Sequence, residues 1–302
     1  MIIVETLSHN YADRAALTEV SFRVRAEEVF GLLGPNGSGK STLFRILSTM
    51  MAPTSGRARI AGFDVVEQSD QVRQKIGVVF QSQSLDKKLT VEENLRGQGH
   101  LFGMSGAVLG SRMDGAMERL GLADRRKDLV ESLSGGLRRR VEIAKALLHE
   151  PRVLLMDEPS TGLDPGARRE LWQYIDDLRT RQGVTVLLTS HLLDEAERCD
   201  RLLLLHQGRI VAEGTPAELK ARIGGDVVVL EAADAQSLRA QLAQKFGVEP
   251  KIVDSGLRIE IANGHRFIAE AVEAFPGSIR SVALHKPTLE DVFLDETGAT
   301  IC

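Results

Sequence analysis

Residues 29–42 decide the fold of the first domain, and they read Val29-Phe30-Gly31-Leu32-Leu33-Gly34-Pro35-Asn36-Gly37-Ser38-Gly39-Lys40-Ser41-Thr42. The opening apolar run is typical of a buried strand. The rest fits G-x-x-x-x-G-K-[ST], a loop that binds phosphate when it connects a strand to a helix. Glycines let its backbone N–H groups surround the phosphates, and the next helix adds the positive end of its dipole. The stretch therefore predicts a nucleotide site.

Two side chains of this loop have expected roles. Lys40 would reach the β- and γ-phosphates, and the Ser41 hydroxyl would coordinate Mg²⁺. The alternative is a glycine-rich turn that holds a lysine by chance. The flanking strand and helix favour the phosphate loop.

Three further apolar runs also end in polar residues. These are residues 76–80 before Gln81, 153–156 before Asp157 and Glu158, and 184–190 before His191. Such runs, alternating with helical patterns, predict an α/β domain with a largely parallel sheet. Because ligands bind outside the carboxyl ends of parallel strands, we expect these polar groups to converge on one edge.

The carboxylates at the end of the second of these runs have different expected roles. Asp157 would hold the Mg²⁺ shell, as an aspartate does in phosphate-loop ATPases. Glu158 would act as the general base that polarises the attacking water. A helix N-cap or a surface pair in a turn is the alternative, but Pro159 and the upstream loop favour catalysis.

A second anion site is expected in the stretch Ser132-Leu133-Ser134-Gly135-Gly136-Leu137-Arg138-Arg139-Arg140. Gly135 and Gly136 permit close backbone approach, and a helix from about Leu137 presents unpaired N–H groups. The phosphate loop already encloses the β- and γ-phosphates of the chain's own nucleotide. We therefore expect Ser134, Gly135 and Gly136 to contact a nucleotide that another subunit holds. Standing alone, the motif would be an ordinary turn that caps a helix.

From about Ile2 to Leu219 these motifs resemble the ATP-binding cassette (ABC) family. The resemblance implies that Tyr11 stacks on adenine and that His191 contacts the γ-phosphate. It implies that Gln81 links Mg²⁺ and the attacking water to a transmembrane partner, and that Asp164 contacts the opposite subunit. It also implies an antiparallel β subdomain, ATP hydrolysis in a head-to-tail homodimer, and a separate permease that holds the subunit at the cytoplasmic face of the membrane.

Each single-residue assignment has a structural alternative. For Tyr11 the alternative is packing at a strand end, and stacking is favoured over it. For Gln81 and His191 the alternative is a polar strand end, but both fall on the predicted ligand edge. Asp164 is also placed to cap the helix that begins near Pro165, alone or in addition to its dimer role.

The resemblance places the cassette domain at residues 1–222, with a helical subdomain at about 86–145. A hairpin is expected over 202–212, and Thr215-Pro216-Ala217-Glu218 is a capping box that starts a helix. After Gly224-Gly225, residues 225–302 follow the order strand, helix, strand, strand, helix, strand, which predicts a small α+β, ferredoxin-like domain.

The C-terminal segment narrows the resemblance. Residues 285–294 resemble the tail of the daunorubicin-resistance type of ATPase subunits, as do 80–86 and 137–140. These subunits pair with separate permeases that export drugs, lipids or polysaccharides. Thr288 and Asp291 form a capping-box variant, and we expect this helix to fasten the tail to a regulatory or dimer-supporting domain.

Composition excludes several classes of protein. A net charge of -4 gives no reason to expect nucleic-acid binding, and the Arg125–Lys127 and Arg138–Arg140 clusters are interpreted as solvent-exposed helix faces. Cys199 and Cys302 lack metal-like spacing, which favours a reducing cytosol. We expect neither a signal peptide nor a spanning helix, since no apolar run reaches about 18 residues. A soluble cassette ATPase with a role outside transport is the alternative function.

Overall fold

The computed structural model describes residues 1–253 and 256–299, which form two compact units. The first unit comprises Met1–Glu213 and the second begins at Gly214. This boundary precedes the expected linker at Gly224-Gly225, because the intervening helix packs within the second unit against the last helix of the chain. Cys302 lies outside the described residues.

The first unit is an α/β domain whose elements alternate along the chain. In order they are β1 (Ile2–Tyr11), β2 (Arg14–Val24), β3 (Val29–Leu33), α1 (Lys40–Leu47), β4 (Ser55–Ile60), β5 (Phe63–Asp64), α2 (Ser69–Arg73), β6 (Ile76–Val79), α3 (Val91–Leu101), α4 (Gly106–Arg119), η1 (Ala123–Arg125), η2 (Val130–Ser132), α5 (Gly135–Leu147), β7 (Val153–Asp157), α6 (Pro165–Gln182), β8 (Thr185–Ser190), α7 (Leu193–Ala196), β9 (Arg201–His206) and β10 (Arg209–Gly214). No helix among the described residues is long and apolar enough to cross a membrane.

A six-stranded sheet in the order β10-β9-β3-β8-β7-β6 forms the centre of this unit. Strands β3, β8, β7 and β6 pair in parallel, so the prediction that the four apolar runs share one sheet is confirmed. All residues of β3 and β8 are buried, as expected for strands covered on both faces. The predicted hairpin is confirmed as β9 and β10.

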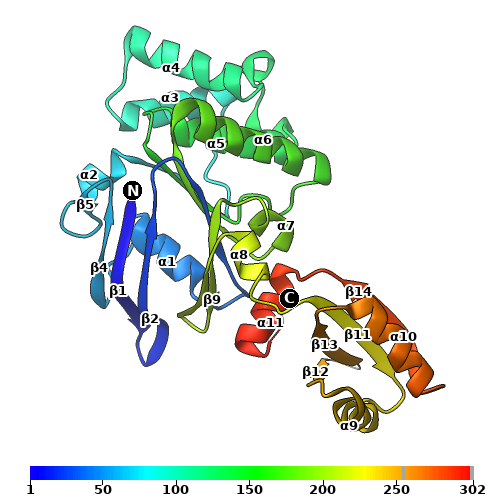
Figure 1. Cartoon of the computed structure of the whole chain (residues 1–302). Helices are drawn as coiled ribbons and strands as arrows, with labels where there is room; N and C mark the ends of the chain where they lie inside the picture. Colours follow the sequence, from blue (N-terminus) through cyan, green and yellow to red (C-terminus); the bar gives the residue numbers. More distant parts are fainter. Residues whose placement is uncertain (254–255, 300–302) are drawn as a thin grey trace. The chain divides into compact units, whose positions relative to one another are not determined.

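A second, antiparallel sheet in the order β2-β1-β4-β5 is the expected β subdomain. One hydrophobic core joins side chains of this sheet, such as Ile2 and Phe22, to those of α1 and the central sheet, such as Leu43 and Leu187. In Figure 1 the blue strands β1, β2 and β4 lie beside α1. The core therefore holds α1, and with it the loop that precedes it, between two sheets.

The helical insertion consists of α3 and α4, which contact α5 (Figure 1). Thr90 opens α3 with a capping box, accepting from the backbone N–H of Glu93 while the Glu93 carboxylate accepts from the Thr90 N–H. A separate core joins these helices to α6 and to one face of the central sheet, for example through Leu95, Met113 and Val186.

The second unit confirms the ferredoxin-like prediction. Its elements are α8 (Pro216–Lys220), β11 (Asp226–Ala232), α9 (Ala235–Phe246), β12 (Lys251–Val253), β13 (Gly256–Ile261), α10 (Gly264–Ala274), β14 (Ile279–His285) and α11 (Leu289–Thr297). The four strands pair antiparallel in the order β12-β13-β11-β14. Thr215 caps α8 with the predicted capping box.

Helix α11 is fastened to this small domain by a buried ion pair. Asp291 accepts from Thr288 in the predicted capping box, and its other oxygen lies 3.0 Å from Nε of Arg258 on β13. The Arg258 and Asp291 side chains are only 3% and 8% exposed. The structural role expected for the tail segment therefore rests on a specific polar contact.

Replacing Asp291 should loosen the small domain, because α11 loses both its capping-box acceptor and its buried ion pair with Arg258, which among the described residues would keep only Glu260 as a partner. We expect Asp291→Ala to lower the opening free energy of α11 and β13 by about 3 kcal/mol. Hydrogen exchange of the full-length chain measures this change. Glu290→Ala, on the exposed neighbour, is the control. Equal protection in the two variants would contradict the assignment.

Candidate nucleotide site

A pocket of about 700 Å³ lies over the phosphate loop, a volume typical of small-molecule sites. It is built from the β1–β2 hairpin, the loop and first turn of α1, the end of β7 and the β9–β10 turn. The lining residues are Tyr11, Arg14, Ala15, Ala16, Asn36, Gly37, Gly39, Lys40, Ser41, Thr42, Glu158, Gln207 and Gly208.

The loop has backbone geometry that requires glycine at Gly37 and Gly39, where φ is 79° and 109°. Gly34 is equally constrained, since a Cβ there would lie 2.2 Å from the Leu205 carbonyl oxygen. Gly39 is the N-cap of α1 and supplies no capping side chain. The first N–H groups of α1 therefore have no capping side chain as acceptor. A bound phosphate would serve as the acceptor instead.

Lys40 is the first residue of α1 and is 5% exposed. Its Nζ donates to the carbonyl oxygens of Gly34 at 2.6 Å and Pro35 at 2.9 Å. Burial lowers the pKa of Lys40, while the Glu158 and Asp157 carboxylates act in the opposite direction. An anionic ligand in the pocket would also stabilise the charged ammonium of Lys40 and so raise its pKa.

Tyr11 and Ser41, which are expected to contact nucleotide and metal, both line the pocket. The Tyr11 ring is 43% exposed and meets the ring of His9 edge-on at a centroid distance of 4.7 Å. Tyr11 therefore borders the pocket with much of its surface exposed.

Glu158 stands at the centre of the polar groups that follow the strands. Its Oε2 accepts from Gln81 Nε2 at 2.9 Å and from the Thr161 hydroxyl at 3.2 Å. Its Oε1 lies 3.3 Å from Nδ1 of His191. The structure thus brings Gln81, Glu158 and His191 together at the ends of β6, β7 and β8.

Thr189 on β8 joins the two carboxylate residues and was not foreseen as part of the site. Its buried hydroxyl accepts from the Glu158 N–H at 2.9 Å and donates to Asp157 Oδ1 at 2.5 Å. Burial raises the pKa of Asp157, and the bond from Thr189 opposes that shift. The one available signal in the sequence is a hydroxyl residue near the end of an apolar strand.

The Ser134-Gly135-Gly136 motif lies elsewhere on the first unit. Ser134 is the N-cap of α5, and its Oγ accepts from the Leu137 N–H at 3.3 Å. Ser134 and Gly135 are exposed. Within the described chain, none of the three residues lines the pocket over Lys40.

Asp164 caps α6, which is one of its two expected roles. The carboxylate accepts from the N–H groups of Gly166 at 2.9 Å and Ala167 at 3.0 Å at the start of α6. These bonds, from Ala167 first, lower the pKa of Asp164.

The interpretation of Arg138–Arg140 as a solvent-exposed face is wrong for Arg139. That residue is 7% exposed and its guanidinium binds the backbone behind Glu158. The prediction failed because three adjacent arginines cannot share one face of a helix, and the middle one points inward.

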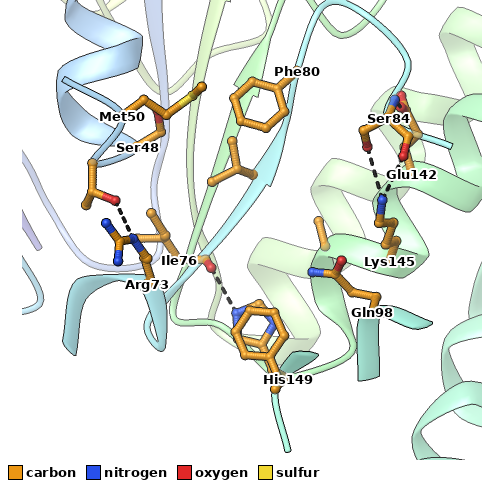
Figure 2. Close-up of a pocket in the computed structure, with 14 residues that line it drawn as sticks. Ser48, Met50, Arg73, Ile76, Phe80, Ser84, Gln98, Glu142, Lys145 and His149 are labelled. Atoms are coloured by element: carbon orange, nitrogen blue, oxygen red, sulfur yellow. Dashed lines mark hydrogen bonds between the residues drawn. The ribbon is translucent and has the colours of Figure 1, made fainter. Parts of the chain in front are cut away.

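A separate cleft of about 480 Å³ opens beside the residues that follow β6 (Figure 2). Phe80 and Ser84 come from the segment after β6, Gln98 from α3, Lys145 from α5, and His149 from the turn that follows α5. Lys145 Nζ donates to the Ser84 carbonyl at 2.9 Å. The cleft therefore borders the segment that begins with Gln81.

Two family models match the chain. Residues 17–161 match the ABC transporter family, and residues 214–297 match the C-terminal domain of DrrA1-3-like ATP-binding proteins. The second match covers most of the ferredoxin-like unit.

Curated relatives match over almost the whole chain. The daunorubicin resistance ATP-binding protein DrrA3 of Streptomyces coeruleorubidus is 39% identical over 98% of this chain and 96% of its own. The Nod factor export ATP-binding protein I of Ralstonia nicotianae is also 39% identical, over 99% of this chain and 94% of its own.

Solved structures agree with this assignment. An ATP-binding subunit of an ABC transporter aligns with a TM-score of 0.67 and 32% identity, over 74% of this chain and 93% of its own. The ATP-binding cassette MJ0796, solved as a post-hydrolysis dimer with ADP and phosphate, aligns with a TM-score of 0.64 and 28% identity, over 71% and 98% of the two chains. The chain belongs to the ABC transporter family as an ATP-binding and ATP-hydrolysing subunit with a DrrA-like C-terminal domain.

Proposed function

We propose that this subunit powers export through a separate transmembrane permease, for a substrate of the drug, lipid or polysaccharide class. The names of the most similar relatives, in daunorubicin resistance and Nod factor export, support export. The observation that carries the mechanism is that the chain holds a phosphate-loop motif in one pocket and, outside that pocket, a second exposed helix start at Ser134, which would bind an anion.

Catalysis is assigned to the groups around Glu158. Its carboxylate would take a proton from the attacking water as general base. Gln81 and His191 contact the two carboxylate oxygens from neighbouring strands and would hold that carboxylate and the γ-phosphate in line. Lys40 would bind the β- and γ-phosphates once its bonds to the loop carbonyls are released.

The donor set also fits Mg²⁺, which prefers carboxylate and hydroxyl oxygens together with phosphates. Asp157, Ser41 and Gln81 would hold it, and Thr189 fixes one Asp157 oxygen in place. When bound, the ion would neutralise phosphate charge during hydrolysis.

Dimerisation is part of the proposed chemistry. The exposed start of α5, with Ser134, Gly135 and Gly136, would contact the γ-phosphate held by the loop of a second copy, head to tail. Asp164 would contact that copy through its Oδ2 atom, because Oδ1 is used in capping. Hydrolysis then removes the bridge between the subunits and lets them separate.

The permease would dock in the cleft shown in Figure 2. Its rim includes Met50, which is 63% exposed, and the segment after β6 leads directly to Gln81. Large exposed apolar side chains beside a polar-rimmed cleft are typical of interaction sites. Through its permease the subunit would lie at the cytoplasmic face of the membrane.

Glu158→Gln tests the proposal. We expect ATP binding to persist while turnover falls on the order of 10²-fold or more, because the general base is lost. The ATP-bound dimer should then be long-lived and visible by size-exclusion chromatography. Glu67→Gln, on an exposed glutamate, is the control. A Glu158→Gln protein that stays monomeric with ATP and still hydrolyses it would contradict the assignment.

Ser134→Arg separates binding from hydrolysis. An arginine at the exposed start of α5 should block the partner's phosphate, so turnover should be lost while ATP affinity of the isolated monomer stays within about twofold, a difference near 0.4 kcal/mol. Fluorescent-nucleotide titration and phosphate release measure the two quantities. Ser105→Arg, at the N-cap of α4, is the matched control. An equal fall in monomer affinity and turnover would place the motif in the chain's own site.

Thr189→Val tests the bridge between the carboxylates. Loss of the hydroxyl leaves the Glu158 N–H without that acceptor, and we expect turnover to fall about tenfold, equivalent to roughly 1.4 kcal/mol. The pKa of Asp157, already raised by burial, should rise further without the Thr189 donor. The acidic limb of the pH–rate profile should therefore move to higher pH. Thr189→Ser should keep the wild-type profile, and an unshifted limb in Thr189→Val would contradict the role.

A further inference from the structure

The buried guanidinium of Arg139 connects α5 to the catalytic turn of the same subunit. Its Nε donates to the Pro159 carbonyl at 2.8 Å, and its Nη2 lies 3.3 Å from the carbonyl oxygens of both Asp157 and Glu158. One side chain thus binds three consecutive carbonyls around the carboxylate that is assigned as the base.

That turn needs support, because Glu158 has a φ of 44°. A non-glycine residue in the left-handed region is strained and persists only when its surroundings hold it. Thr189 binds the Glu158 N–H from one side, and Arg139 binds its carbonyl from the other. These contacts fix the direction in which the Glu158 side chain leaves the backbone.

The same guanidinium also holds the end of β6. Its Nη1 donates to the Phe80 carbonyl at 2.6 Å and to Glu142 Oε2 at 2.9 Å. Phe80 directly precedes Gln81, whose amide contacts Glu158. Arg139 therefore sets the separation of the two backbone segments that carry these side chains.

Glu142 extends the contact along α5. Its Oε1 accepts from the Ser84 N–H at 2.6 Å, and Lys145 binds the Ser84 carbonyl. Figure 2 shows Glu142 and Lys145 beside Ser84 at the cleft. The Arg139 and Glu142 side chains are 9% and 2% exposed, so solvent screens their pairing little.

We propose that Arg139, paired with Glu142, is a positioning residue that aligns Glu158 with Gln81 and ties both to the helix whose N-terminus is Ser134. When the partner's nucleotide contacts the start of α5, any shift of that helix would then move Arg139 and, through it, Glu158 in the subunit's own site. The inference rests on the proposed role of Glu158. Arginine suits the task because its planar fork reaches several carbonyls at once, whereas a lysine ammonium is a single point charge.

Arg139→Lys tests this role, since it keeps the charge beside Glu142 but loses the fork. We expect kcat for ATP to fall about 10- to 100-fold through misalignment of the base. The KM for ATP and the thermal unfolding midpoint should stay near wild type. Arg140, the next residue on α5, pairs with exposed Glu170. The control variant Arg140→Lys should therefore keep full activity.

A second variant covers the case in which Arg139→Lys does not fold. Arg139→Met with Glu142→Leu removes both buried charges together, so no uncompensated charge remains, and kcat should again fall at least tenfold. If either variant folds and keeps the wild-type kcat while Glu158→Gln is inactive, the role of Arg139 is overturned and the proposed function stands. Wild-type turnover by Glu158→Gln would overturn the proposed function together with the role of Arg139.

Discussion

The strained turn at the end of β7 is the constraint on which the first unit depends. Glu158 takes a left-handed backbone conformation there, and its N–H and carbonyl are bound by Thr189 and Arg139 from opposite sides. The parallel sheet places Gln81 and His191 on either side of the same carboxylate. The order of the strands therefore determines the geometry of the groups to which we assign catalysis.

The chain offers two glycine-rich helix starts, and we propose that both take part in the recognition of phosphate. Gly39 leads into α1 inside the pocket, and Ser134 leads into α5 outside it. A helix N-terminus favours an anion whichever chain supplies it. In the proposed two-subunit enzyme the exposed second start would bind the partner's phosphate, and the contacts of α5 with the turn at Glu158 would connect the two sites.

Much of this arrangement could be predicted from the sequence, because apolar runs and glycine patterns report on local structure. Residues 29–42 predicted the strand, loop and helix, and the βαββαβ order predicted the second unit. Thr189 and Arg139 could not be assigned in this way, since their partners are backbone atoms distant in sequence. Arg139 lies in a basic cluster, and only the packing of α5 shows that it points inward.

The most direct test of the two-subunit site is the structure of the Glu158→Gln protein bound to ATP, determined by crystallography or cryo-electron microscopy. We predict a head-to-tail dimer in which Ser134 and Gly135 of one copy contact the γ-phosphate held by Lys40 of the other. An ATP-bound protein in which the start of α5 contacts no nucleotide, or contacts that of its own chain, would contradict it.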